Sequence, residues 1–545
     1  MNPSPPRCLA WLLRFGAAVV LLNALITLEN LPGSAAVRPG QRLSFELCLL
    51  VLALLLWAAW RGPLHRRAAS CIATVWLALA ALRYADSTVR ELFGRPINLV
   101  WDARHAGEVM AMAAVDIGRL RLVLFATFAL LGTGLLFVAT RAAVRALADA
   151  LRWRAPRPWL ISSLAALGAS FAAHPFVAQD TRWYFSLPVA PTLAHQAALL
   201  SGALSRERTD ARLTPSPHFD GNLGALHGAD VLLLFAESYG MSSFDEPRQA
   251  KAFHASRAHL SDAIDASGRH VVSARVRSPT FGGASWLAHA ALLTGVDTHD
   301  PDDHALLLTT QRPTLARHFA AHGWRSVAWM PGLQRPWPEG AFYGFERIAG
   351  APDIGYTGPG FGYWRIPDQA AMALLQAQEL AGEPQAGGGT RPPRFIVFAT
   401  TNTHAPFRPL PPYQPDWARL LGADAYTPQQ VVQALRTPPA VADPVGAYVE
   451  SVAAAYEWLG AWLREKAPAN LLTVVIGDHQ PVATVAGADA SWDVPVHIIS
   501  GDAALVQRLR AAGFAPGLDP AGSHLGTMHA LTPVLLAAFD QPAVH

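Results

Sequence analysis

The stretch VLLLFAESYG, residues 231–240, places an unbroken apolar run directly before a glutamate and a serine. The stretch LLTVVIGDHQ, residues 471–480, repeats this arrangement with an aspartate and a histidine. A third run, FIVFAT at residues 395–400, leads into His404. Short apolar runs bounded by polar residues are typical of strands that are buried on both faces. Three such strands would therefore end in side chains that can bind a metal.

Two further apolar runs and several helical stretches extend this pattern. The runs are Ser326–Met330 and Val494–Ile499, and the helical stretches are Pro313–His322, Asp368–Leu380 and Pro444–Lys466. Strands that alternate with helices predict an α/β domain, placed here at residues 228–545, with a central, mainly parallel sheet. Ligands of such sheets gather at the carboxyl ends of the strands. His497, inside one run, is either a substrate contact or a hydrogen-bonded core histidine.

A serine that follows two glycines is a candidate nucleophile. Residues 278–285 read SPTFGGAS and precede a helical segment, Trp286–Leu293. Ser285 would then lie beside the positive end of a helix dipole, which favours an oxyanion or a phosphate at that position. The alternative is that Ser285 only caps the helix, because serine is a preferred N-cap residue. The spacing alone favours neither role.

The first third of the chain reads as a membrane anchor. Of all residues, 51% are hydrophobic and 15% are charged, against about 25% charged in an ordinary soluble chain. A membrane span takes about 20 apolar residues. We therefore predict a transmembrane domain at residues 1–179, followed by a linker at 180–227. Its five helices are expected at about 9–28, 43–60, 68–85, 122–140 and 159–178.

The anchor also has a predicted orientation. With the N-terminus inside, the cytoplasmic loops carry nine arginines and the opposite loops carry seven, which is a weak majority under the positive-inside rule. This places the α/β domain outside the cytoplasm. A cleaved signal peptide is the alternative for the first span, but no small-residue cleavage site stands out after it and four further spans follow.

Charge and cysteine content exclude other classes of protein. The net charge of +3 is too small to indicate a polyanionic partner, and nothing resembles a nucleic-acid-binding module. All three cysteines, Cys8, Cys48 and Cys71, lie in or beside predicted spans. The α/β domain therefore has no disulfide, thiol nucleophile or zinc–cysteine site.

The order of the motifs resembles that of the alkaline phosphatase and sulfatase superfamily. The order is Glu-Ser, Phe-Gly-Gly-Ala-Ser, Thr-His-Ala-Pro-Phe and Gly-Asp-His, spread over residues 228–540. The resemblance is greatest to the membrane-anchored branch, which contains lipoteichoic acid synthases, phosphoglycerol transferases and phosphoethanolamine transferases. It implies an alkaline-phosphatase-like fold behind a five-helix anchor in the bacterial inner (cytoplasmic) membrane. The multi-pass chain would hold its catalytic domain on the extracytoplasmic side.

The resemblance also implies roles for individual residues. Ser285 takes the position of the nucleophile and also of a metal ligand. The other implied metal ligands are Glu237, Asp478 and His479, which would hold one divalent ion, Mn²⁺, Mg²⁺ or Zn²⁺. His404 matches a histidine that contacts the substrate phosphate, and Trp337 matches a residue of the headgroup pocket.

At three positions the sequence departs from the patterns of the known enzymes, and each departure weakens the match to one class of them. Glu339 stands where the synthases have an arginine, and this suits an ammonium headgroup better than an anionic one. Ser491 stands where the lipid A enzymes have another histidine. The sequence after Ser285 does not match the Cys/Ser-x-Pro-x-Arg signature of sulfatases.

The implied reaction is metal-dependent transfer of a phospholipid headgroup, through a phosphoseryl intermediate, to an extracytoplasmic glycan. Phosphatidylglycerol is the favoured donor because the neighbourhood of His404 is most similar to that of the synthases. The alternatives are a phosphoethanolamine transferase that uses phosphatidylethanolamine, a phosphoester or phosphodiester hydrolase with the same ligands, and a catalytically silent membrane scaffold.

Overall fold

The computed structural model describes residues 5–31, 35–93, 96–99, 102–103, 107, 110–111, 114, 118–173, 184–204, 212–381, 391–437, 444–487, 489–520 and 522–541. The chain divides into two compact units, Met1–Ser205 and Arg206–His545. Each unit is described by itself.

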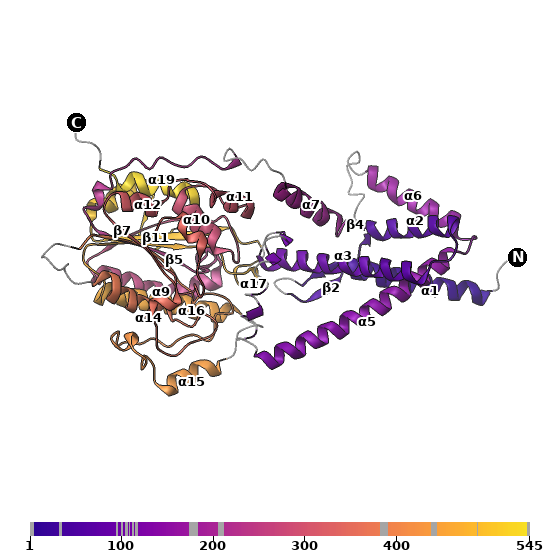
Figure 1. Cartoon of the computed structure of the whole chain (residues 1–545), viewed down its shortest axis with the longest axis horizontal. Coiled ribbons are helices and arrows are strands. Elements are labelled where there is room, and N and C mark those ends of the chain that lie inside the picture. The colour runs from indigo at the N-terminus through magenta and orange to yellow at the C-terminus, as the bar shows by residue number, and fades with distance from the viewer. Residues whose placement is uncertain are drawn as a thin grey trace. The chain divides into compact units, whose positions relative to one another are not determined.

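The second unit is built around one large sheet, in which the described residues form nine strands (Figure 1). The spatial order is β12-β6-β11-β10-β5-β9-β7-β8, and β13 also pairs with β6. The strands are β5 (Asp230–Ala236), β6 (His270–Arg277), β7 (Arg325–Trp329), β8 (Arg347–Ala349), β9 (Arg394–Ala399), β10 (Leu471–Gly477), β11 (Asp493–Ser500), β12 (Ala515–Pro516) and β13 (His524–Thr527).

Strand directions confirm the predicted α/β fold with a mainly parallel sheet. Strands β10, β5, β9, β7 and β8 run parallel to one another, with Val474 opposite Leu233 and Leu233 opposite Val397. Strand β11 differs, because it pairs antiparallel with both β10 and β6. The 15 residues between β10 and β11 carry Asp478 and His479 and include the short helix α17.

Alternate side chains of the central strands face two separate cores. Val231, Leu233 and Phe235 of β5 enter one hydrophobic cluster, whereas Leu232 and Leu234 enter the other. This follows from the two-residue period of a strand. Both faces are apolar, which explains why β5 reads as a continuous hydrophobic run.

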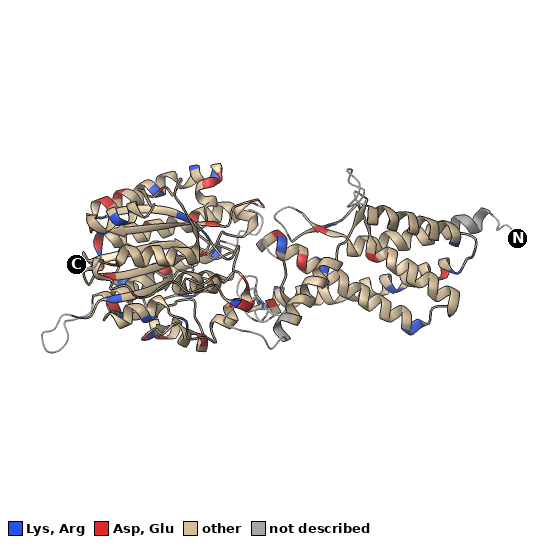
Figure 2. Cartoon of the chain, turned by 90° about the horizontal axis from the view of Figure 1, so that it is seen from above, with Lys and Arg blue, Asp and Glu red and all other residues tan. Residues whose placement is uncertain are grey.

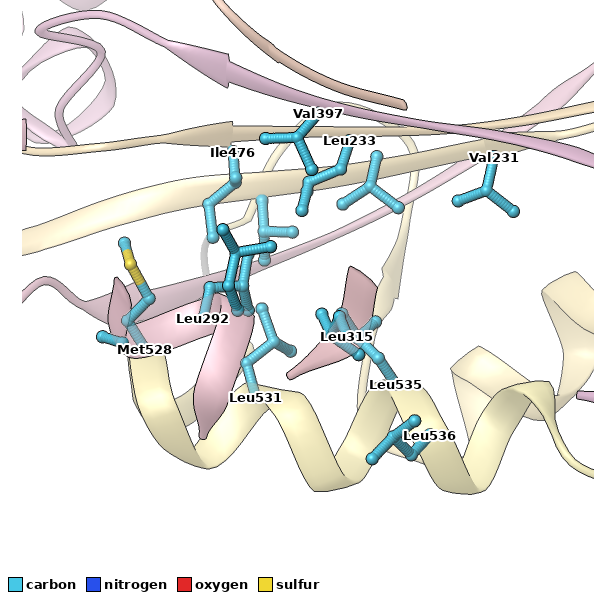
Figure 3. Close-up of a cluster of buried hydrophobic side chains, with 14 of the residues drawn as sticks. Val231, Leu233, Leu292, Leu315, Val397, Ile476, Met528, Leu531, Leu535 and Leu536 are labelled. Atoms are coloured by element: carbon cyan, nitrogen blue, oxygen red, sulfur yellow. The ribbon is translucent and has the colours of Figure 1, made fainter. Parts of the chain in front are cut away.

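Helices α10, α12 and α19 cover one face of the sheet, and α9, α14 and α16 cover the other (Figure 1). Figure 3 shows the first face, where Leu233, Val397 and Ile476 lie over Leu292 and Leu531. The helices of this unit are α8 (Ser242–Asp245), α9 (Pro247–Ala266), α10 (Ser285–Thr294), α11 (Pro301–Leu307), α12 (Leu315–Ala321), α13 (Ala351–Ile354), α14 (Asp368–Leu375), α15 (Pro428–Arg436), α16 (Pro444–Glu465), α17 (Ala483–Ala486), α18 (Ala503–Ala511) and α19 (Met528–Phe539). Short turns of other helix types are η3 (Gly224–Leu226), η4 (Pro338–Phe342), η5 (Gln376–Leu380) and η6 (Arg419–Leu421).

The first unit is mostly helical, and charged side chains are sparse along its helices (Figure 2). Its described helices are α1 (Pro5–Ile26), α2 (Phe45–Trp60), α3 (Arg66–Phe93), α5 (Arg119–Leu151), α6 (Arg157–Ala173) and α7 (Ala190–Leu204). Short strands β1 (Leu28–Asn30), β2 (Val37–Pro39), β3 (Leu43–Ser44) and β4 (Phe185–Ser186) connect some of them.

Two of these helices, among the described residues, are long and apolar enough to cross a membrane: residues 66–92 of α3 and all of α5. The apolar part of α1, Trp11–Ile26, and α2 are shorter. Each predicted span overlaps a helix, although residues 174–178 of the fifth lie outside the described residues. The five-helix membrane domain therefore stays a prediction. Helix α7 falls within the stretch predicted as a linker.

Candidate active site

The site forms where β5 and β10 end side by side. The loop after β5 carries Glu237, and the loop after β10 carries Asp478 and His479. The loops approach so closely that a glycine is required in each. A Cβ atom on Gly477 would lie 1.8 Å from the carbonyl oxygen of Tyr239, and one on Gly240 would lie 1.8 Å from Oε1 of Gln480.

Hydrogen bonds from the loop after β9 fix the loop after β5. The Glu237 backbone N–H donates to Oγ1 of Thr400 over 3.0 Å, and the Thr403 hydroxyl donates to the Glu237 carbonyl oxygen. The parallel register of three neighbouring strands thus sets the position of Glu237. The predicted gathering of polar residues at the strand ends is what the structure shows for Glu237, Asp478 and His479.

Ser285 joins this cluster from the start of α10. It is the first helical residue, and the N-cap is Ala284, which has a left-handed backbone (φ 62°) and makes no side-chain cap bond. The Ser285 hydroxyl lies 3.2 Å from Oε2 of Glu237 and 3.2 Å from Nε2 of His479. Ser285 is therefore not the helix cap, and its hydroxyl faces the carboxylate and the imidazole.

The donor set fits a divalent metal. One atom from each of Glu237, Asp478 and His479 lies within 4.8 Å of the other two, and all three residues are buried. Nδ1 of His479 lies 2.7 Å from the Gln480 carbonyl oxygen. A carbonyl can only accept, so Nδ1 carries the proton and Nε2 presents its lone pair to the cluster. Two carboxylates, one imidazole and a hydroxyl suit Mn²⁺, Mg²⁺ or Zn²⁺.

The electrostatics of the two carboxyl groups also favour a cation. Burial and the negative charge of Glu237 raise the pKa of Asp478 well above its usual range. Burial opposes ionisation of Glu237 as well, but its interactions with the neighbouring His479 and His404 rings and its hydrogen bonds with Asp478 and Ser238 bring its pKa to about 2. Two carboxylates this close cannot both ionise cheaply in a buried site. A bound divalent ion would neutralise both.

His404 lies near the cluster on the loop after β9. Its Nδ1 lies 2.6 Å from the Ala405 carbonyl oxygen, so its Nε2 is the nitrogen left for other partners. The ring packs edge-on against Trp364, with 5.5 Å between centroids. The hydroxyl of Thr403, the preceding residue, donates to the Glu237 carbonyl oxygen, so His404 lies on a loop that contacts the cluster.

Asp368, at the start of α14, holds the loop that carries His404. Its carboxylate accepts from the Thr401 N–H (2.8 Å), the Thr401 hydroxyl (3.1 Å) and the Asn402 N–H (3.0 Å). Burial and the charge of Glu237 outweigh these bonds and raise the pKa of Asp368 to about 6. Sequence reasoning missed this residue, since no local pattern links it to a loop more than 30 residues away.

The other candidates lie on different parts of the unit. Trp337 precedes η4 and packs on Tyr343, with 5.4 Å between ring centroids, and Glu339 lies exposed on η4. Their roles in the headgroup pocket stay predictions. His497 is buried in β11, where Nδ1 lies 2.7 Å from the Ser273 hydroxyl and Nε2 lies 3.0 Å from the Tyr239 hydroxyl. It is a hydrogen-bonded core histidine, which was one of the two predicted alternatives.

Another residue that the sequence reasoning missed is His289, one helical turn after Ser285 on α10. Its ring packs on Phe235 at 4.3 Å between centroids. Burial lowers its pKa to about 4; the charge of Glu237 opposes this shift and His479 adds to it. The spacing of four residues from Ser285 is the signal that points to it, because such residues share a helix face.

Several solved structures are similar to this chain. A protein from Vibrio parahaemolyticus described as being in the alkaline phosphatase superfamily has 17% identity, covering 57% of this chain and 67% of its own, at a TM-score of 0.36. The lipoteichoic acid synthase LtaP from Listeria monocytogenes has 12% identity, 60% and 75% coverage and a TM-score of 0.35. The phosphoglycerol transferase GacH from Streptococcus pyogenes, solved with sn-glycerol-1-phosphate, has 13% identity, 50% and 68% coverage and a TM-score of 0.32.

The protein from Vibrio parahaemolyticus is the one described as a member of the alkaline phosphatase superfamily. This is the superfamily that the four motifs resemble. No protein-family model matches the chain, and no curated protein matches it significantly. The chemistry of this chain therefore rests on the residues of its own site.

Proposed function

We propose that this protein transfers the headgroup of a membrane phospholipid, through a phosphoserine at Ser285, to an extracytoplasmic glycan. The observation that carries the proposal is the position of the Ser285 hydroxyl, 3.2 Å from both Glu237 and His479 at the start of a helix. A serine in contact with metal-binding groups and a helix N-terminus is suited to attack a phosphate.

In the first step, Oγ of Ser285 attacks the headgroup phosphorus and the bond from phosphorus to the diacylglycerol oxygen breaks. The Ser285 hydroxyl gives up its proton as it attacks, and diacylglycerol leaves as an alcohol by taking up that proton. Glu237, Asp478 and His479 would hold a divalent ion, which when bound would lower the pKa of the Ser285 hydroxyl and place positive charge beside the phosphate. The first turn of α10 adds its positive dipole end.

In the second step, a hydroxyl of the acceptor glycan attacks the phosphoserine, and the bond from phosphorus to Oγ breaks. Oγ recovers its proton and Ser285 is regenerated. His404, whose Nδ1 donates to the Ala405 carbonyl oxygen, would as an imidazolium also donate from Nε2 to an equatorial phosphate oxygen, and in both steps this would stabilise the phosphoryl transition state. Trp337 and Glu339 are the proposed wall of the headgroup pocket.

The apolar helices of the first unit give the enzyme access to its lipid donor. We propose the five-span anchor in the bacterial inner membrane, with the α/β domain on the extracytoplasmic side. Phosphatidylglycerol is the proposed donor. Phosphatidylethanolamine is the competing donor, because the exposed carboxylate of Glu339 is suited to an ammonium group.

The test supplies the full chain in membranes with Mn²⁺ and either phosphatidylglycerol or phosphatidylethanolamine, labelled in the acyl chains. We expect release of labelled diacylglycerol from phosphatidylglycerol and no release by Ser285→Ala. Release that needs no glycan and yields the free headgroup phosphate would identify a hydrolase. No release from either lipid would refute the transferase, and so would equal release by the variant.

A further inference from the structure

Ser238, which follows Glu237, has an unusual backbone. Its φ is 55°, in the left-handed region that residues other than glycine rarely adopt. Such a conformation persists only where surrounding contacts hold it. The residue is also buried, so its polar groups need partners within the protein.

All three polar groups of Ser238 have partners, and two of these partners are the carboxylates of the site. The backbone N–H donates to Oδ1 of Asp478 over 2.8 Å. The hydroxyl donates to Oε1 of Glu237 over 2.8 Å. The carbonyl oxygen accepts from the Tyr448 hydroxyl over 3.0 Å.

We infer that Ser238 is a positioning residue that holds the two metal-binding carboxylates together and fixes their orientation at the metal site. Ser238 bonds Oε1 of Glu237, which lies 3.6 Å from Nε2 of His479, and this leaves Oε2 facing the Ser285 hydroxyl. Oδ1 of Asp478 accepts from both the Ser238 and the His479 N–H groups, and its other oxygen, Oδ2, lies 3.6 Å from Nε2 of His479.

The left-handed backbone is what allows one residue to reach both carboxylates. The two carboxylates come from different strands, β5 and β10, and the N–H and O–H groups of Ser238 reach one each. The Tyr448 hydroxyl, from α16, ties down the carbonyl oxygen and so fixes the peptide on the other side. Partners that orient metal ligands in this way typically change metal affinity by about 10–100-fold when they are removed.

Two substitutions separate the hydroxyl from the backbone strain. Ser238→Gly relieves the strain, because glycine accepts positive φ, and keeps the N–H bond to Asp478. Ser238→Ala keeps a Cβ atom. Both lose the hydroxyl bond to Glu237. Ser243→Ala is the matched control, since Ser243 is a buried serine whose hydroxyl donates to the Gly240 carbonyl oxygen at 2.8 Å and not to a carboxylate.

The experiment measures the Kd of Mn²⁺ by isothermal titration calorimetry and the Tm of the metal-free protein, using the full chain in detergent. We expect both Ser238 variants to bind Mn²⁺ at least about 10-fold more weakly, whereas Ser243→Ala binds as tightly as the wild type. Ser238→Gly should unfold no earlier than Ser238→Ala without metal, so that its weaker binding reflects lost orientation and not lost folding.

The inference rests on the metal site of the proposed function, and the two can fail separately. If the wild type binds Mn²⁺ and either Ser238 variant binds it with unchanged affinity, the role of Ser238 is overturned and the metal site stands. If the wild type does not bind Mn²⁺, or Glu237→Gln binds it equally well, the proposed metal site itself is wrong.

Discussion

Gly477→Ala tests whether the contact between the two ligand-bearing loops builds the site. The new Cβ atom would lie 1.8 Å from the Tyr239 carbonyl oxygen, where ordinary contact begins at 3.4 Å, so the loops would have to separate by about 1.6 Å. The obstacle is backbone, which cannot rotate away as the end of a side chain could. The substitution therefore acts on both stability and metal affinity.

The magnitude follows from the bonds that this separation would break. The Ser238 N–H to Asp478 Oδ1 bond (2.8 Å) and the Asp478 N–H to Ala236 carbonyl bond (3.3 Å) would both be lost, at about 1 kcal/mol each. Overpacking adds about 1–3 kcal/mol. We expect a loss of about 3–5 kcal/mol in the free energy of unfolding, which is a fall of roughly 5 °C in Tm for a unit of this size.

The assay follows thermal unfolding of the full chain in detergent and measures Mn²⁺ affinity on the same sample. The control is Gly446→Ala, in α16, where a Cβ atom would meet nothing within 4 Å and alanine favours the helix. The control should match or exceed the wild type in Tm. If Gly477→Ala unfolds at the wild-type temperature and binds Mn²⁺ as tightly, the two loops are not packed as described and the reasoning is wrong.

Three further changes have defined outcomes. The pKa of Asp368 is raised from 3.8 to about 6, so its contribution to stability is full below pH 4 and about 3 kcal/mol is lost as the pH rises through 6. Asp368→Asn should remove this loss. Unfolding free energies of variant and wild type that change in parallel over pH 4–7 would contradict this prediction. Mn²⁺ at about 100 times its Kd should stabilise the wild type by about 2.7 kcal/mol; EDTA should reverse the effect, and a similar gain in Glu237→Gln would count against the site. Leu292→Ala, which truncates a side chain with no exposed surface, should lower the free energy of unfolding by about 2–5 kcal/mol and leave the Mn²⁺ affinity unchanged. Denaturant unfolding measures the first quantity and calorimetry the second, and an unchanged stability or a weakened Mn²⁺ affinity would contradict the prediction.

The central strands could be predicted from the sequence because their environment is uniform. Strands β5, β9 and β10 are buried on both faces, so each reads as a run of apolar residues. Strand β6, HVVSARVR, was not predicted, because serine and arginine interrupt its run and it pairs with β11 in an antiparallel ladder. Strands β12 and β13 are too short to leave a pattern.

The site was predictable for a similar reason, but its supporting residues were not. Glu237 and Asp478 directly follow apolar strands, and parallel strands bring their ends together. The orientation of the Ser285 hydroxyl depends on the left-handed backbone at Ala284. A glycine at this position would have signalled that conformation, but an alanine does not. Ser238 and Asp368 act through hydrogen bonds to distant loops, so their roles appear only once those loops have been placed.

The central claim is that Ser285 carries the headgroup phosphate during turnover. The most direct measurement incubates the full chain and Mn²⁺ with phosphatidylglycerol radiolabelled in its phosphate, without a glycan acceptor, then quenches in acid and maps the labelled peptide. We predict that the label is bound covalently to the peptide containing Ser285 and is absent from Ser285→Ala. Label on another residue, or normal turnover by Ser285→Ala, would contradict the account.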